Sequence, residues 1–150
     1  MTKFNPSYLV RKATLSDVMF FYEAIVATAG LTLNENDFSA IYQAKLKIKS
    51  NQLLILLDTH GDIAGCTVIE HRAALIEDFP FFEIQFFFIK PKYRKHHAAE
   101  VLYHEIEKVA IEKKCFKIIV SSLLSATINQ RFYTKKGFKL IKKTFLKTLL

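Results

Sequence analysis

Tryptophan is absent from this chain of 150 residues, and glycine and cysteine are scarce, with four and two residues. Cys66 and Cys115 lie far apart, and neither belongs to a metal-binding spacing, so the sequence indicates neither a disulfide framework nor a structural zinc site. Four glycines beside 14 phenylalanines and 51% hydrophobic residues exclude a disordered chain and indicate a densely packed core. The length predicts one domain over residues 1–150.

Long apolar runs are missing as well. Stretches such as residues 86–89 are far shorter than the roughly 20 residues that a membrane-spanning helix needs. The first residues contain no apolar segment of signal-peptide length. Together with cysteine usage typical of a reducing compartment, these absences predict a cytoplasmic protein that does not cross a membrane.

The chain has an excess of positive charge, with 22 Lys and Arg against 14 Asp and Glu and a net charge of +8. The cations either form solvated faces or bind an anionic partner, which is a nucleic acid or a phosphorylated cofactor. No recognition-helix pattern, zinc finger or aromatic RNA-binding motif accompanies the charge, which argues against nucleic acid. A basic nucleic-acid-binding domain is kept as a third class of function, which strongly salt-dependent DNA or RNA affinity would reveal.

Hydrophobic periodicity and turn signals predict a strand, two helices, three strands, a helix, a strand, a helix and one or two last strands. Thr14 and Asp17 form a capping box before the first helix, and Gly30 ends it. The predicted strands cover about residues 8–12, 53–57, 63–72, 82–89, 116–121 and 138–149, and the predicted helices about 14–29, 34–50, 97–113 and 126–136. This order predicts an α/β fold with a mixed sheet and helices on both faces.

Residues 83–99 combine a buried strand, a Pro-marked turn and a basic loop that opens directly into a helix. The order places the free N–H groups and positive dipole of a helix N-terminus beside several cations, which is a favourable site for a phosphate or pyrophosphate. Period-2 alternation predicts that Glu83, Gln85, Phe87 and Ile89 share one strand face that lines a cleft. An anion site and a carboxylate on one segment indicate group transfer from a phosphate-bearing donor.

Three segments in order, residues 10–17, 83–99 and 131–138, resemble the GCN5-related N-acetyltransferase (GNAT) family. Glu83, Gln85, Arg131 and Tyr133 are similar to their counterparts in small members such as aminoalkylphosphonate N-acetyltransferase. The resemblance implies a GNAT fold, whose mostly antiparallel sheet of six or seven strands splays at its centre. It also implies acetyl-CoA as donor and a primary amine of a small molecule as acceptor, which attacks directly. A homodimer is an open option, and no metal is implied.

The acetyl-CoA loop of this family reads Gln or Arg, two residues, Gly, one residue, then Gly or Ala, and it aligns with residues 94–99. Ala99 fits, whereas His97 stands where Gly lets the backbone approach the pyrophosphate, and Glu100 adds a negative charge. These departures motivate an alternative, a degenerate GNAT-fold module that binds acyl-CoA or a protein without catalysis. The resemblance assigns cofactor binding to the strand end, the loop and one helical residue, namely Phe87, Phe88, Ile89, Arg94, Lys95, His96, His97, Ala98, Ala99 and Asn129.

The candidate catalytic residues are Glu83 and Tyr133. An alkylammonium is no nucleophile until it loses a proton, which the Glu83 carboxylate can accept directly or through water. The alternative for Glu83 is a strand-end carboxylate merely exposed to water. By resemblance, the Tyr133 hydroxyl protonates the departing thiolate, Asn129 one turn earlier contacts the cofactor, and the N–H near Ile89 polarises the acetyl carbonyl. The alternative for Tyr133 is a core aromatic residue next to Phe132.

Overall fold

The computed structural model describes residues 7–30, 32–73, 80–120, 127–139 and 147–149. Within them five strands form one sheet, in the order β1 (Tyr8–Lys12), β2 (Asn51–Asp58), β3 (Ile63–Arg72), β4 (Phe81–Ile89) and β5 (Ile118–Val120). The first four strands are antiparallel neighbours and β5 runs parallel to β4, so the predicted mostly antiparallel α/β sheet is confirmed. The sheet has five strands rather than six or seven, and most of the further strand region predicted over residues 138–149 lies outside the described residues.

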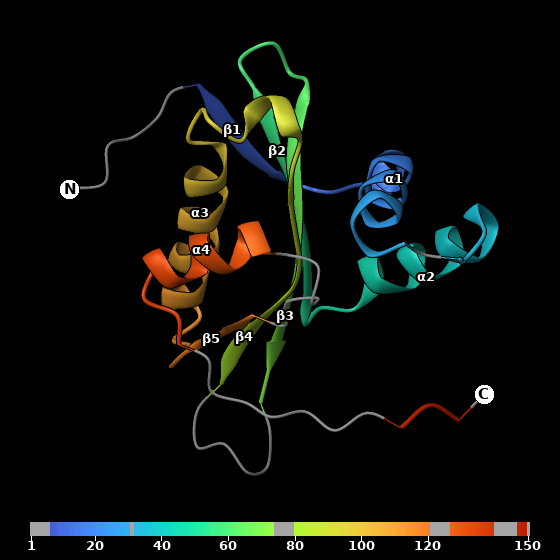
Figure 1. The fold of residues 1–150 in the computed structure, drawn as a ribbon. Helices are drawn as coiled ribbons and strands as arrows, with labels where there is room; N and C mark the ends of the chain where they lie inside the picture. Colours follow the sequence, from blue (N-terminus) through green and yellow to red (C-terminus); the bar gives the residue numbers. More distant parts are fainter. Residues whose placement is uncertain (1–6, 31, 74–79, 121–126, 140–146, 150) are drawn as a thin grey trace.

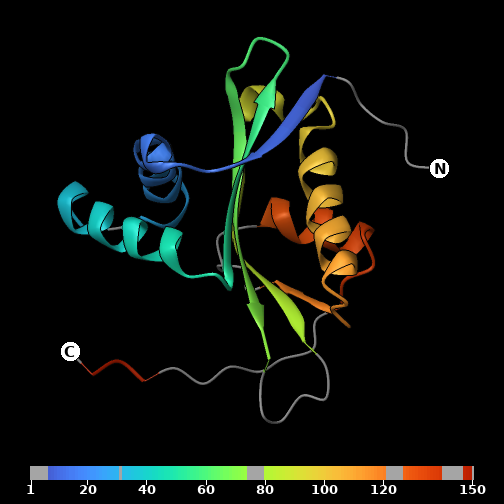
Figure 2. The ribbon, with the colours of Figure 1, turned by 180° about the vertical axis from the view of Figure 1, so that it is seen from behind.

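Helices cover both faces of the sheet, as predicted. The helices α1 (Val18–Ala29) and α2 (Glu35–Lys47) lie on one face, and α3 (Ala98–Glu112) and α4 (Thr127–Lys135) lie on the other (Figure 1; Figure 2 from behind). Two short 3-10 turns, η1 (Leu15–Asp17) and η2 (Pro91–Tyr93), precede α1 and α3. Among the described residues, no helix is both long enough and apolar enough to cross a membrane.

Local signals set the start and end of α1 as the sequence predicts. The capping box is present, because the Asp17 carboxylate accepts from the Thr14 N–H at 2.8 Å. The Arg11 guanidinium also donates two hydrogen bonds to the Asp17 carboxylate, at 2.7 and 2.9 Å. This pairing with Arg11 is the main reason that the pKa of Asp17 is lowered. Gly30 takes a left-handed φ of 64° at the C-cap and donates to the Val26 carbonyl.

Two apolar clusters fill the layers between the helices and the sheet. The cluster under α3 and α4 packs Leu102, Tyr103 and Ile106 of α3 against the sheet residues Leu54, Leu56, Ala64, Ile69, Phe82, Ile84, Phe87 and Ile89. The cluster under α1 and α2 packs Phe21, Ala24, Phe38 and Tyr42 against Leu53, Ile55, Cys66 and Val68. The strand β4 therefore has a helical layer on each side. The direction in which each of its side chains points determines which of the two layers that side chain contacts.

Candidate active site

A β-bulge interrupts β4 at Gln85. Ile84 pairs with Ile69 of β3 and Phe86 pairs with Val68, so Gln85 is an extra residue with no direct partner on β3. Ile84, Phe87 and Ile89 pack in the cluster under α3 and α4, whereas Gln85 contacts Lys45 of α2. The prediction that Glu83, Gln85, Phe87 and Ile89 share one face is therefore wrong, because it assumed unbroken alternation.

Beyond Ile84, no described residue pairs with the edge of β4 that faces away from β3. Among the described residues β5 pairs with β4 only through Phe82, Glu83 and Ile84. The Lys90 N–H donates to Ala64 O of β3 at 2.8 Å, and Thr67 Oγ1 of β3 donates to Phe86 O at 2.7 Å. Because backbone groups alternate along a strand, the N–H groups of Phe87 and Ile89 point away from β3, toward the side that the described part of β5 leaves unpaired. This edge lies in the half of β4 where the central splay is predicted.

Glu83 belongs to a polar cluster on the face covered by α1 and α2. Its carboxylate is paired with the Arg72 guanidinium, and 15% of the Glu83 side chain is exposed. The Gln85 amide donates to Glu70 Oε2 at 2.5 Å and accepts from Lys45 Nζ at 3.4 Å. We call Lys45, Glu70, Arg72, Glu83 and Gln85 the polar cluster. Glu83 is thus half-buried in an ionic network rather than merely exposed to water.

Aromatic rings continue the same face of β4 toward its C-terminal end. Phe86 and Phe88 stack with a centroid distance of 6.2 Å, and Phe20 of α1 meets Phe88 edge-on at 6.1 Å. Lys90 Nζ lies 5.3 Å from the centre of the Phe20 ring. The Phe88 side chain, one of the predicted cofactor contacts, therefore lies on the α1 side of the sheet and not beside Phe87.

Tyr133 lies on the opposite face from Glu83, in the cluster under α3 and α4. The residue is 7% exposed, and its ring packs edge-on against Phe87, Phe132 and Phe138 at centroid distances of 6.2, 5.6 and 5.4 Å. Burial raises the pKa of Tyr133 above its ordinary value. A buried, protonated phenol is consistent with both alternatives for Tyr133, a core aromatic residue and a proton donor, because a donor must carry its proton before the reaction. Asn129 lies one turn earlier on α4.

The predicted cofactor loop, residues 94–99, runs from the end of η2 into the first turn of α3. Arg94 folds back, with its Nε donating to Ile89 O at 3.0 Å, while Lys95 is exposed. His97 has a left-handed backbone, with φ 62° and ψ 11°, at the N-cap of α3. The residue that replaces Gly in the family pattern thus adopts the conformation that favours Gly. Its imidazole is 72% exposed and lies 3.6 Å from the Glu100 carboxylate.

The first turn of α3 can bind an anion. Val101 makes the first intrahelical bond, to His97 O at 3.2 Å, so the N–H groups of Ala98, Ala99 and Glu100 have no acceptor within the helix. The Ala98 side chain is fully buried against the sheet, which fixes the helix end in place. The residues therefore fit a pyrophosphate by their amide donors and helix dipole, with the Glu100 carboxylate as an opposing charge. Among the described residues, no three His, Cys, Asp or Glu side chains gather closely enough to hold a metal ion.

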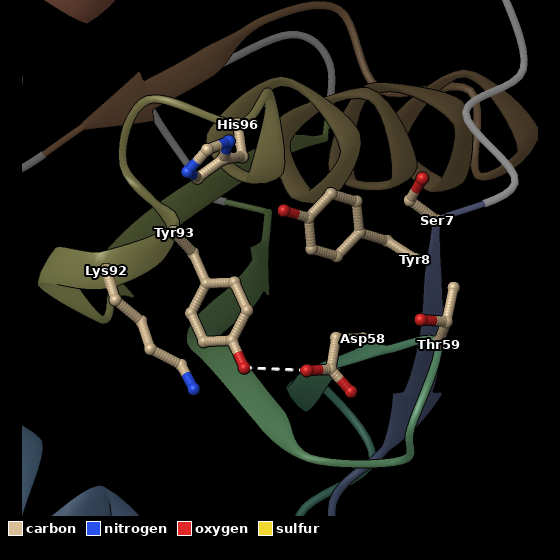
Figure 3. A pocket seen from close by; sticks show the side chains of 7 residues that line it. All are labelled: Ser7, Tyr8, Asp58, Thr59, Lys92, Tyr93 and His96. Atoms are coloured by element: carbon tan, nitrogen blue, oxygen red, sulfur yellow. Dashed lines mark hydrogen bonds between the residues drawn. The ribbon is translucent and has the colours of Figure 1, made fainter.

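A bond from Tyr93 joins the loop to the β2–β3 hairpin. The Tyr93 hydroxyl donates to Asp58 Oδ2 at 2.7 Å (Figure 3). The other carboxylate oxygen, Asp58 Oδ1, accepts the N–H groups of His60 and Asp62. The bond from Tyr93 holds the pKa of Asp58 below its ordinary value. A cavity of about 370 Å³ lies beside this bond, lined by Ser7, Tyr8, Asp58, Thr59, Lys92, Tyr93 and His96. His96 is the member of the predicted cofactor loop that faces this cavity (Figure 3).

The sequence did not predict two long-range contacts of the site, the one from Lys45 to Gln85 and the one from Tyr93 to Asp58. Lys45 reaches β4 from α2, 40 positions earlier in the chain, and Tyr93 reaches Asp58 across 35 positions. Neither pair belongs to a local pattern, so no spacing in the sequence indicates them. The only available signal was the polar ending of the third strand at Glu70 and Arg72, next to an otherwise apolar run.

A mostly antiparallel sheet with helices on both faces, in which a helix N-terminus able to bind an anion follows β4, defines an α/β protein with a phosphate-binding geometry. The sequence matches the acetyltransferase (GNAT) family over residues 18–138, and the chain belongs to that family. It is an acetyltransferase of the GNAT type. A comparison with curated protein sequences finds no match.

Solved structures share the fold at low sequence identity. A transcriptional regulator from Bacillus halodurans has a TM-score of 0.83 and 16% identity, over 95% of this chain and 99% of its own. An aminoglycoside antibiotic 6'-N-acetyltransferase from Acinetobacter baumannii has a TM-score of 0.80 and 13% identity, with the same coverage. A Trypanosoma brucei acetyltransferase has a TM-score of 0.74 and 18% identity, again over 95% and 99%. At these identities the similarity establishes the fold alone.

Proposed function

We propose that this chain transfers the acetyl group of acetyl-CoA to a primary amine of a small molecule by direct attack. The observation that carries the proposal is the arrangement of groups along β4. The Glu83 carboxylate lies on the face of α1 and α2, while the Phe87 and Ile89 N–H groups point away from β3 at an edge that no described residue pairs. A base for the amine and donors for a carbonyl oxygen thus lie on one short segment.

In the proposed reaction the amine nitrogen forms a C–N bond with the acetyl carbon and the C–S bond breaks. Glu83 accepts the proton that the ammonium must lose, an effect typically worth 10²–10⁴-fold in rate. The N–H groups of Phe87 and Ile89 donate to the carbonyl oxygen as its negative charge grows. Tyr133 donates a proton to the departing sulfur, and the second proton that the nitrogen loses as the amide forms passes through solvent and restores the phenol. Acetyl-CoA supplies the activated acyl group, and the loop residues 94–99 with the first amides of α3 bind its phosphates.

Isothermal titration with acetyl-CoA, followed by a free-thiol assay with a panel of amines, tests the proposal. We expect saturable binding and thiol release that depends on the amine. Lys95→Glu, beside the α3 N-terminus, should weaken binding about tenfold, because it replaces an attractive charge near the phosphates with a repulsive one. The control Lys113→Glu makes the same change at the other end of α3 and should leave the affinity within about twofold.

Two outcomes would contradict the proposal. An absence of heat at millimolar acetyl-CoA would mean that the α3 N-terminus holds no cofactor. Binding without thiol release for any amine would instead support the non-catalytic acyl-CoA-binding alternative, which the His97 and Glu100 substitutions motivated.

A further inference from the structure

One side of α2 carries apolar side chains that are open to solvent. The helix lies at the outside of its layer, and Phe38 and Tyr42 on its inner side are buried in the cluster under α1 and α2 (Figure 1). Ile41, and Ile48 at the C-cap, are instead 48% and 49% exposed. Positions three or four apart share one face of a helix, and the exposed face that holds these two residues comprises Asp37, Ala40, Ile41, Ala44, Lys47 and Ile48. We call these six residues the outer stripe of α2.

The outer stripe has the composition of a helix–helix contact. A helix face that meets only water is mostly charged or polar, whereas four of these six positions are apolar. Single exposed apolar residues are ordinary on a protein surface, but here they follow one another along one face. Ala40 and Ala44 are small and lie one helical turn apart on either side of Ile41, so a second helix can come close to the backbone of α2.

The charges at the two ends make the outer stripe complementary to itself. Asp37 lies in the first turn of α2 and Lys47 in the last. In an antiparallel pair of α2 helices across a two-fold axis, Asp37 of each copy lies opposite Lys47 of the other, and Ile41 lies near the axis. A parallel pair would instead bring like charges together. The same order of charges suits the dipole of a single helix, so the exposed apolar residues between the two ends are what indicates a partner.

We infer that the outer stripe binds the outer stripe of a second copy of this chain, with the two α2 helices antiparallel across a two-fold axis. The inference does not depend on the proposed acetyl transfer. The helix has 13 residues and is therefore about 20 Å long, so a contact between two such helices buries less than the roughly 1,600 Å² of a standard interface. We therefore expect a weak dimer, with a dissociation constant of about 10–100 μM.

Sedimentation velocity of the full chain at concentrations from roughly 5 to 500 μM tests for this dimer. We expect the wild type to change from monomer to dimer over this range. Ile41→Asp places two carboxylates near the axis and should keep the chain monomeric throughout. Gln43→Asp is the matched control, because position 43 is exposed but lies about 200° around the helix from position 41, and it should dimerise like the wild type.

Two charge reversals test the antiparallel arrangement. Asp37→Lys and Lys47→Glu each bring like charges together at both ends of a symmetric contact, so each alone should weaken dimerisation about tenfold or more. An equal mixture of the two variants should dimerise nearly as well as the wild type, because opposite charges meet again at both ends of the mixed pair. Glu35→Lys makes the same change in the same first turn but off the outer stripe, and should leave dimerisation unchanged.

Three outcomes would overturn the inference. A chain that stays monomeric at every concentration would mean that the outer stripe is bare or contacts a different protein. A dimer that survives Ile41→Asp would lie on another surface. Charge variants that do not recover dimerisation when mixed would exclude the antiparallel pairing. Circular dichroism checks the fold of each variant, and if Ile41→Asp fails to fold, the mixture of the two charge variants, both at exposed positions, decides alone.

Discussion

The two faces of β4 differ in chemistry although one short strand supplies both. Under α3 and α4 the strand presents Phe87 and Ile89 to a buried aromatic cluster that includes Tyr133. Under α1 and α2 it presents Glu83 and Gln85 to an ionic network with Arg72 and Lys45. A continuous sheet would keep groups on these two faces apart, because the backbone lies between them.

In the proposed reaction, this difference puts the candidate base Glu83 and the candidate acid Tyr133 on opposite faces of the sheet. The bulge at Gln85 puts the side chains of Phe87 and Ile89 on the opposite face from Glu83, and Tyr133 of α4 packs against Phe87 on that face. Acceptor chemistry is thus assigned to the α1–α2 side and donor chemistry to the α3–α4 side. The following variants test this separation of the two sides, in decreasing order of expected effect.

Inserting one alanine between Val68 and Ile69 should have the largest effect. The added residue would pair with Gln85 and remove the bulge, so the residues on one side of the insertion must shift register or exchange faces. We expect a loss of roughly 3 kcal/mol or more in the free energy of unfolding, measured by denaturant unfolding. Gln85→Ala retains the bulge and should cost only about 1 kcal/mol for the lost hydrogen bonds. An insertion variant with wild-type stability would show that the bulge is not needed to separate the faces.

Glu83→Gln tests the acceptor side. The amide keeps the shape of the carboxylate but cannot accept the amine proton, so activity should fall about 10²-fold or more. The loss should shrink at high pH, where the amine deprotonates without help. A pH–rate profile by thiol release measures this, with Glu112→Gln at the exposed end of α3 as control. An unchanged profile would end the assignment of Glu83 as base.

Tyr133→Phe tests the donor side with a smaller expected effect. The ring packing is preserved and the hydroxyl is lost, so kcat should fall about tenfold while the affinity for acetyl-CoA stays within about twofold. Tyr103→Phe is the matched control, because Tyr103 is buried in the same cluster and burial raises its pKa as well. If both variants retain the wild-type kcat, Tyr133 is a core residue only.

His97→Gly should have the smallest effect. It changes the N-cap residue of α3, where the phosphates of the donor are proposed to bind. His97 and Lys114 are the two non-glycine residues with positive φ in the described part of the chain, at 62° and 57°. Glycine relieves about 1 kcal/mol of backbone strain at either position, measurable as added stability. Only His97→Gly should also tighten acetyl-CoA binding, by severalfold in titration calorimetry. An equal gain in affinity for Lys114→Gly would show that the histidine does not obstruct the phosphates.

Local features of the fold could be predicted from the sequence because their causes are local. The strands Tyr8–Lys12 and Ile63–Arg72 have the predicted bounds, and the Thr14–Asp17 capping box and the Gly30 helix end lie where the residue types place them. Each depends on neighbours within a few positions. The order of such elements predicted the mixed α/β sheet with helices on both faces, and the resemblance of three segments implied the GNAT fold.

The site could be predicted only in part. Residues 94–97 lead directly into the N-terminus of α3, which begins at Ala98, as the pattern indicated. The bulge could not be foreseen, since no Gly or Pro marks Gln85, and three consecutive phenylalanines hide which face each one takes. The network around Glu83 depends on Lys45, which only tertiary packing brings to β4. The roles of Glu83 and Tyr133 stay predictions.

The bond from Tyr93 to Asp58 has a consequence for motion. One carboxylate closes the β2–β3 turn through the amides of His60 and Asp62 and also holds the loop that begins α3. Turn and loop should therefore open together as one cooperative unit, with linked rates of amide hydrogen exchange. A ligand that steadies the loop would slow exchange in a turn that it never touches, which makes the hairpin a remote reporter of occupancy at the α3 N-terminus.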